Sequence, residues 1–281
     1  MNRHSRAIYS LLAVTLAAGC VPLEQHTARF EKKWPATTVT RLDVHEIDGT
    51  ISVDGNSPGE ISMVAVVHAR GVRPDPRKEY QGYFRTELDS GTLTIRTPGE
   101  HGVHFGWGRD VRVDYELRVP ATVALELRTV NGRIETRAIA GQTAASTVNG
   151  EVDIEATGLN EVAAKTVNGR VQARFLDDFH GARLGTVNGR VVAILPASAS
   201  FLGDFTQING DFEAAFPLNI HSHPGSRRVS GDVNGGRYAL KISTVNGDIK
   251  IDNTTPPVPA APMAIPAVPA PPAPPAKPPR T

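Results

Sequence analysis

Two short histidine pairs are the residues of this chain best suited to metal chemistry. His101 and His104 flank a Gly-Val dipeptide, and His221 and His223 flank a single serine. A structural metal site needs three or four such ligands in closed geometry. Each pair stands in a Gly- or Pro-rich stretch, and the chain has only one Cys to add to it. We therefore expect exposed loop histidines and no metal site.

Adjacent carboxylates at Asp177 and Asp178, with His180 nearby, could bind Ca²⁺ or act as acid and base. Enzymes built as β-helices use such acids to cut polysaccharides. The neighbouring repeats carry no matching acids at the equivalent places, 158–161 and 196–199. No nucleophile elbow, phosphate-binding loop or metalloprotease motif occurs in the sequence. The sequence thus predicts a non-enzymatic protein without a cofactor or a small-molecule substrate, and a polysaccharide-acting β-helix enzyme is the alternative.

The single Cys ends a segment with the pattern of an export signal. Arg3 and Arg6 give this segment a positive start, and residues 7–17 form an apolar core that is too short to cross a membrane as a helix. The segment closes on Leu-Ala-Ala-Gly-Cys20, which resembles the end of a lipoprotein signal peptide covering residues 1–19. The resemblance implies that Cys20 bears the lipid and anchors the mature chain to a membrane.

One position departs from the lipoprotein pattern, because Ala17 stands where Leu is common, three residues before the Cys. The alternative is ordinary secretory cleavage after Ala18 or Gly19, with an incidental Cys. A lone Cys favours lipidation, since an exported chain with one thiol forms no internal disulfide. Val21 follows in place of the Asp that commonly retains lipoproteins at the inner membrane. In a Gram-negative host we therefore expect the outer membrane.

Composition and strand patterns divide the rest of the chain into four parts. Residues 20–37 are predicted to be a polar tether, and residues 254–281 a disordered Pro/Ala-rich tail with polyproline II character. Residues 38–120 hold longer and less regular strands, which are either the first coils of the repeat structure or a sheet that caps it. Residues 121–253 hold the repeats. A formal net charge of +1 gives no reason to expect nucleic acid as a partner.

A four-residue phrase, Thr-Val-Asn-Gly, recurs through residues 121–253 at steps of about 20 residues, which is the repeat length of stacked-repeat architectures. Asn-Gly is the favoured pair for a tight turn whose two central residues have positive φ. We expect the Asn amides to hydrogen-bond from one repeat to the next. The predicted column of turns, one of which is a drifted copy, consists of Asn131, Gly132, Asn149, Gly150, Asn168, Gly169, Asn188, Gly189, Asn209, Gly210, Asn246 and Gly247.

Apolar residues alternate with polar ones on both sides of each turn, which predicts half-buried strands and an all-β fold. One architecture that fits is an antiparallel meander. The other is a β-solenoid with coils of about 20 residues, in which each strand pairs in parallel with its counterpart one coil away. We favour the solenoid, with each Asn corner directly over the previous one. Like residues recur at like positions, and extra residues such as 176–181 fall opposite the turn, where a coil tolerates a bulge.

The residues that follow each Gly support stacking, because opposite charges would mostly be neighbours along the column. Such exposed pairs contribute only a few tenths of a kcal/mol each, so they indicate register and not a binding site. These residues are Arg133, Glu151, Arg170, Arg190 and Asp211.

The repeats, together with the closing segment 244–249 and the opening segment 46–53, resemble the bacterial putative-adhesin family. Its members are domains of unknown function, also called toastrack domains. The resemblance covers roughly residues 41–252, and implies a right-handed, single-stranded β-helix and a location in the cell envelope. It carries over no catalytic residues. We therefore predict a lipoprotein whose solenoid offers a repeated surface to an envelope protein or glycan; the further alternative is a structural or regulatory envelope stress factor.

Overall fold

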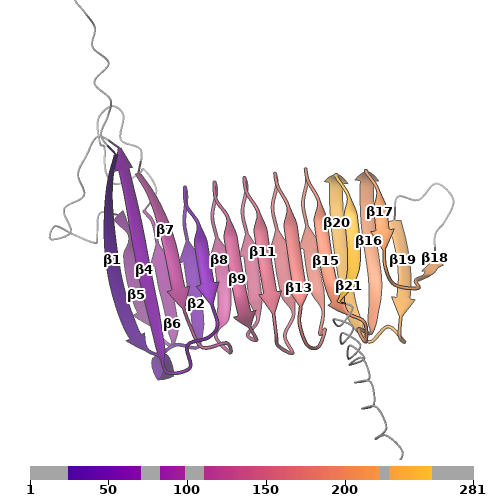
Figure 1. Ribbon diagram of the computed structural model, residues 1–281, viewed down its shortest axis with the longest axis horizontal. Helices are drawn as coiled ribbons and strands as arrows, with labels where there is room; N and C mark the ends of the chain where they lie inside the picture. The colour runs from indigo at the N-terminus through magenta and orange to yellow at the C-terminus, as the bar shows by residue number, and fades with distance from the viewer. Residues whose placement is uncertain (1–24, 71–82, 99–110, 222–227, 255–281) are drawn as a thin grey trace, which may run out of the picture.

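The computed structural model describes residues 25–70, 83–98, 111–221 and 228–254, which form two β-sheets packed face to face (Figure 1). The predicted signal peptide with Cys20, the histidines at 101, 104 and 223, and the tail from residue 255 onward lie outside the described residues. A short 3-10 helix, η1 (Ala36–Thr38), joins the first two strands. Within these described ranges, no helix is long and apolar enough to cross a membrane.

Each repeat contributes one strand to each sheet, and most neighbouring strands are parallel. The ten-stranded sheet contains, in spatial order, β1 (Gln25–Pro35), β4 (Glu60–Arg70), β7 (Val111–Arg118), β3 (Ile51–Asp54), β9 (Ile134–Ile139), β11 (Val152–Ala156), β13 (Val171–Phe175), β15 (Val191–Pro196), β21 (Ile249–Thr254) and β17 (Phe212–Ala214). The eleven-stranded sheet contains β18 (Asn219–His221), β19 (Arg228–Val233), β16 (Phe201–Asn209), β20 (Tyr238–Asn246), β14 (Ala182–Gly185), β12 (Val162–Lys165), β10 (Thr143–Ser146), β8 (Ala124–Arg128), β2 (Arg41–His45), β6 (Thr92–Arg96) and β5 (Arg85–Asp89).

The middle coils stack in chain order, from β8–β9 through β10–β11 and β12–β13 to β14–β15. Val152 lies opposite Val171, and Val171 lies opposite Val191, so that like positions form one row. The two strands that flank a corner pair with the neighbouring coils and not with each other. The prediction of an all-β solenoid is therefore confirmed, and the antiparallel meander is wrong for these repeats.

The stacking order departs from chain order at both ends (Figure 1). The last coil, β20–β21, lies between β14–β15 and β16–β17, and the first coil, β2–β3, lies between β6–β7 and β8–β9. The prediction that Asn209 lies directly over Asn188 is therefore wrong, because Asn246 lies between them. Thr244 is buried between two coils, and Gln207 of the drifted copy lies beside it in the next coil, where its amide donates to the Gly247 carbonyl.

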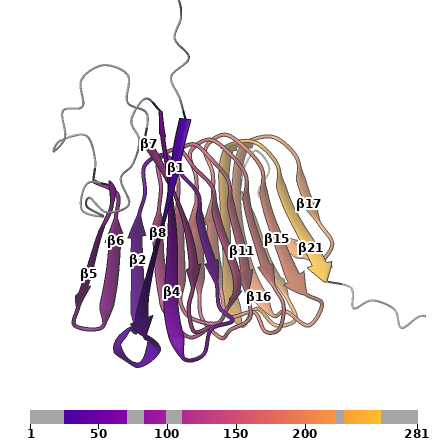
Figure 2. The same cartoon turned by 60° about the vertical axis from the view of Figure 1, so that its left-hand side comes forward.

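Antiparallel strands cover the N-terminal end of the stack, where β4 pairs with β7 and β1 pairs with β4 (Figure 2). The predicted tether of residues 20–37 is therefore wrong from Gln25 onward. Ala28 and Phe30 are buried while Arg29 is exposed, so β1 does alternate, but its many charged residues concealed this pattern. Residues 38–120 supply both coils and cap, since β2–β3 and β6–β7 are coils whereas β4 and β5 are antiparallel additions.

Aliphatic and small side chains fill the space between the sheets in the middle of the stack, and aromatic rings collect towards its two ends. Phe84 makes edge contacts with Phe30 and Tyr115, with ring centroids 5.7 and 6.1 Å apart. A large ring buries more apolar area than an aliphatic side chain, which suits a position with coils on one side only. The second aromatic group begins at the end of β13 and extends to β16, and it consists of Phe175, Phe179, Phe201 and Phe216.

Candidate functional site

The asparagines of the corners form one hydrogen-bonded column. In each coil the Asn Nδ2 donates to the Oδ1 of the Asn in the adjacent coil, over 2.8 to 2.9 Å. All the amides point the same way, from Asn209 at one end to Asn131 at the other. Asn131 Nδ2 donates to Asp48 Oδ1 over 2.7 Å, and the column ends there because a carboxylate accepts but cannot donate. The predicted corner asparagines therefore hold the coils in register.

The corners are not the tight turns that Asn-Gly pairs predict. No asparagine of the column has a positive φ, and its backbone forms a parallel bridge to the asparagine of the adjacent coil. In the column, positive φ is confirmed for glycines alone, such as Gly169 with φ +146, and a second reason for glycine is the close approach of neighbouring coils. A Cβ on Gly150 would lie 2.7 Å from the carbonyl carbon of Gly132, and one on Gly169 would lie 2.8 Å from that of Gly150. Any larger residue would force the coils apart.

Threonine and valine of the repeated phrase point in opposite directions. Each Thr is buried, and its hydroxyl donates to the Gly carbonyl of the adjacent coil, as from Thr166 to Gly150 over 3.1 Å. Each Val points outward, and Val148 is 40% exposed. The alternation of the sequence did not predict this orientation, because Val is equally common in the core. The exposed apolar column consists of Val130, Val148, Val167, Val187, Val245 and Ile208.

The acidic pair that could serve as acid and base lies at an exposed corner. Asp177 and Asp178 are exposed at a corner, between Phe175 and Phe179, whose rings pack together in the core. His180 lies against the ring of Tyr238 at 4.4 Å between centroids, and not against the acids. In the described ranges, no group of three or more His, Cys, Asp or Glu residues could hold a metal ion.

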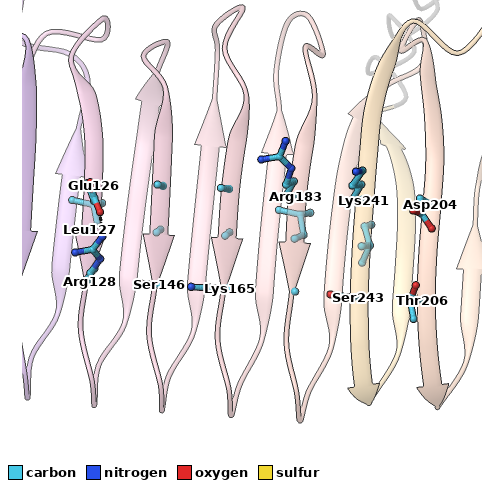
Figure 3. Close-up of a pocket in the computed structure, with 17 residues that line it drawn as sticks. Glu126, Leu127, Arg128, Ser146, Lys165, Arg183, Asp204, Thr206, Lys241 and Ser243 are labelled. Atoms are coloured by element: carbon cyan, nitrogen blue, oxygen red, sulfur yellow. Dashed lines mark ion pairs between the residues drawn. The ribbon is translucent and has the colours of Figure 1, made fainter.

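A shallow groove of about 580 Å³ runs along the outer face of the eleven-stranded sheet, across β8, β10, β12, β14, β20 and β16 (Figure 3). Strand register creates its floor, since Ala144 lies beside Ala163 and Ser146 lies beside Lys165. The sequence does contain a signal for this groove. In several repeats, the strand before the corner carries a small residue at an outward position. The small residues of the floor are Ala144, Ser146, Ala163, Gly185 and Ser243.

Positive charge dominates the groove. Its cations are Arg128, Lys165, Arg183 and Lys241. Its carboxylates, Glu126 and Asp204, lie towards the two ends, and each already pairs with an arginine. Figure 3 shows the pair of Glu126 and Arg128 on one strand, with Arg183 and Lys241 on two neighbouring strands further along. Neither Lys165 nor Lys241 forms an ion pair with any carboxylate in the described part of the chain.

Glu46 is a buried carboxylic acid that occupies the Thr position of the first coil. It accepts hydrogen bonds from the Thr97 hydroxyl and, over 3.2 Å, from the backbone N–H of Asp48. Thr97 also shares a hydrogen bond of 2.8 Å with the Tyr115 phenol. Burial raises the pKa of Glu46 to about 7, and the hydrogen bonds offset this only in part. Glu46 borders a second hollow of about 760 Å³, which runs along the exposed Val column.

The charged residues after the corner glycines pair as expected in the middle of the stack. Arg133 contacts Glu151, and Arg170 lies 3.5 Å from the same carboxylate. Arg190 pairs over 2.9 Å with Asp248, because the last coil is inserted beside it. Because exposed ion pairs contribute little energy, we interpret these pairs as aligning neighbouring coils and not as a binding site.

The geometry defines a β-solenoid whose repeated corners are cross-linked by hydrogen bonds and whose outer face carries a charged groove. The sequence model of the Toastrack DUF4097 family matches residues 109–252, just over half of the 281 residues. The chain therefore belongs to this family. A comparison with curated proteins gave no match.

Several solved structures resemble the chain over most of its length. A "putative cell adhesion protein" from Clostridium sporogenes ATCC 15579 is 11% identical, covers 81% of this chain and 99% of its own, and gives a TM-score of 0.41. A "putative adhesin" from Bacteroides fragilis NCTC 9343 is 8% identical, with coverages of 80% and 97% and a TM-score of 0.31. A "putative lipid binding protein" from Parabacteroides distasonis ATCC 8503 is 10% identical, with coverages of 79% and 96% and a TM-score of 0.30. At such identities the likeness concerns the fold alone.

Proposed function

We propose that this protein is a non-enzymatic, lipid-anchored protein of the bacterial cell envelope that presents its groove to a protein or glycan partner. The groove itself carries the proposal. Its volume of about 580 Å³ falls within the range of roughly 300–1,000 Å³ that ligand sites occupy. It is built on strands held in register by the ladder of Asn131 to Asn246, so it is a rigid, pre-formed surface.

A binding role agrees with how the repeats use their polar side chains. The Thr hydroxyls bond to glycine carbonyls and the Asn amides bond to one another, so the repeated residues hold the stack together. What varies from coil to coil is the outward residue of the groove: Ala144, Ala163, Arg183 and Lys241 occupy equivalent positions on adjacent strands. A constant scaffold with variable outward residues suits recognition of an extended partner.

The test of binding is capture from the protein's own envelope. Photo-crosslinking from groove positions should recover the same protein or glycan in repeated experiments. The variant Ala144→Gln with Ala163→Gln fills the floor and should lose this product, whereas Ala215→Gln, at an exposed position after β17, should keep it. Recovery of no reproducible partner would contradict the proposal and favour a purely structural role. Glycan cleavage by the purified protein would favour the enzyme alternative.

The lipid anchor is tested separately. Mass spectrometry of the mature N-terminus should find an acylated Cys20, and Cys20→Ser should move the protein from the membrane fraction to the soluble fraction. Secretory cleavage without lipid would instead leave an unmodified thiol and the same fractionation for both proteins. That result would remove the anchor from the proposal and leave the groove argument intact.

A further inference from the structure

The outward residues of the groove form two straight rows across the strands. Strand register aligns Glu126, Ala144, Ala163, Arg183, Lys241 and Asp204 in one row. It aligns Arg128, Ser146, Lys165, Gly185, Ser243 and Thr206 in the other. Both rows run along the axis of the stack, so the groove is a track that repeats with the coils. Its natural occupant is a linear polymer that lies parallel to this axis.

The cations of the track are regularly spaced. Arg128, Lys165 and Lys241 stand on β8, β12 and β20, and one strand separates each from the next. Since neighbouring strands lie about 4.8 Å apart, these cations are about 10 Å apart across the strands, with Arg128 and Lys165 in one row and Lys241 in the other, two residues along its strand. The guanidinium of Arg183 lies between the two lysines and pairs with Glu161 over 3.3 Å. Lys165 and Lys241 pair with no described carboxylate, so they are the cations left to receive negative charge from a partner.

The floor between the cations is shallow and combines small apolar residues with hydroxyl groups. Ser146, Ser243 and Thr206 present hydroxyl groups, and Ala163 and Gly185 leave room above the sheet. Hydroxyls that line a flat track can exchange hydrogen bonds with the hydroxyls of sugars. Among the residues that the structure describes, no aromatic side chain lines the groove, and such rings are the stacking platforms that proteins use to hold single-stranded nucleic acid.

A peptide is a poorer fit than a glycan. Peptides that add to a sheet do so at an exposed edge, where backbone N–H and C=O groups are free. The strands under the groove, β8, β10, β12, β14 and β20, have neighbours on both sides, so their backbone groups are already paired. Acidic peptides would also need apolar pockets for their side chains to be recognised with any specificity, and the outward apolar residues of the floor are only Ala144, Ala163 and Gly185.

We propose that the groove binds a linear acidic polysaccharide, laid across the strands, with its carboxylates at Lys165 and Lys241. A chain with a carboxylate on every second sugar presents its charges at an interval close to that of the cations. This inference rests on the proposed binding function and names the class of its ligand.

Titration calorimetry with defined probes tests the assignment. The probes are an oligosaccharide of hyaluronan, which has one carboxylate per disaccharide, and neutral dextran, poly-glutamate and a single-stranded DNA oligonucleotide. Hyaluronan should bind, and added salt should weaken its binding, because exposed charge pairs are screened. The variant Lys165→Gln with Lys241→Gln should bind roughly 5- to 30-fold more weakly, the amount expected for two surface ion pairs.

A control on the opposite face keeps the total charge change equal. Arg174 and Lys250 point outward from the ten-stranded sheet, and Arg174→Gln with Lys250→Gln should bind hyaluronan as the unmodified protein does. Far-ultraviolet circular dichroism should show that both double variants keep their strands. Equal losses in the two double variants would overturn the assignment to the groove, because they would show an effect of overall charge.

The other outcomes separate the inference from the proposed function. If poly-glutamate or DNA binds as tightly as hyaluronan and depends on the same lysines, the site recognises charge alone and the glycan assignment is wrong. Binding of dextran with equal affinity would also refute it. If no polysaccharide binds while crosslinking from the groove recovers an envelope protein, the inference fails and the proposed function stands. If neither experiment finds a ligand, both fail.

Discussion

The replacement Glu46→Gln should stabilise the protein at alkaline pH and leave it unchanged at acid pH. Glu46 is buried beside Thr97 and Asp48, and burial is the main reason that its pKa is raised from 4.5 to about 7. A glutamine at this position has nearly the same shape. Its amide oxygen can accept the hydrogen bond of the Asp48 N–H in place of Oε1, and its NH2 group stands in place of Oε2, where it can donate to the Thr97 hydroxyl as the O–H of the neutral acid does. The replacement therefore removes the charge and little else.

The sign of the effect follows from the direction of the shift. Below pH 4.5 the acid is protonated in both the folded and the unfolded chain, so the stability associated with the neutral buried group is fully present. As the pH rises towards 7, the unfolded chain ionises first, and this stability is lost. A difference of one unit between the pKa values of the folded and unfolded states changes the free energy of unfolding by about 1.4 kcal/mol. The rise in the pKa of Glu46 from 4.5 to about 7 therefore lowers the free energy of unfolding by about 3 kcal/mol above pH 8.

The assay is urea unfolding at pH 4.5 and pH 8, followed by circular dichroism for the unmodified protein and the variant. The variant should be more stable by about 3 kcal/mol at pH 8, and the two proteins should differ by less than about 0.5 kcal/mol at pH 4.5. Other titrating groups are common to both proteins and cancel in the comparison. Glu87→Gln, an exposed carboxylate on β5, serves as a control and should have little effect at either pH.

Two results would refute this reasoning. A difference between the variant and the unmodified protein that is the same at both pH values would mean that Glu46 is not held neutral by burial. A variant less stable at pH 8 would mean that the negative charge is favourable in the folded protein, for example through a cation that reaches the site in solution.

Three further predictions concern the corners of the stack. Gly150→Ala should cost more than about 3 kcal/mol of unfolding free energy or prevent folding, because its Cβ would overlap the adjacent backbone, whereas Gly59→Ala, with nothing within 4 Å, should be nearly neutral in thermal unfolding. Asn168→Ala removes two ladder bonds and should cost about 1–2 kcal/mol in urea unfolding, and Asn209→Ala, at the end of the ladder, should cost about half as much; equal costs would contradict the ladder. Asn234 precedes a Gly on an exposed turn with φ +49, so peptide mapping of aged protein should find its deamidation before that of any ladder asparagine.

The repeat spacing was enough to predict the solenoid. When coils stack, equivalent residues of successive coils contact one another in the core and at the corners, so the same residue types recur at a fixed spacing. Gly150 and Thr147 illustrate this, since each contacts the glycine of the adjacent coil and therefore recurs with it. Spacing does not say which coils are neighbours. Asn209 and Asn246 both follow Asn188 in the sequence as corner asparagines, and only the structure shows that Asn246 is the one beside it.

The groove could not be predicted from the sequence for a related reason. Its floor consists of outward Ala and Ser residues, such as Ala144 and Ser146, which carry no chemical signature of their own. They become a surface only when strands from distant parts of the chain, such as β14 and β20, are placed side by side. The charged residues that line it, such as Lys165, resemble any solvated strand residue in the sequence. The raised pKa of Glu46 could not be predicted from the sequence either, because it results from burial in the fold.

The insertion of the last coil has a mechanical consequence. β21 ends at Thr254; it pairs with β15 along its whole length and with β17 on the other edge from Ile249 to Ile251. A force applied to the chain beyond Thr254 would act along the strand and load both sets of bonds together in shear. An outermost strand would instead unzip one bond at a time. A pull on this end of the fold therefore has to break the bonds of β21 to two strands of other coils at once.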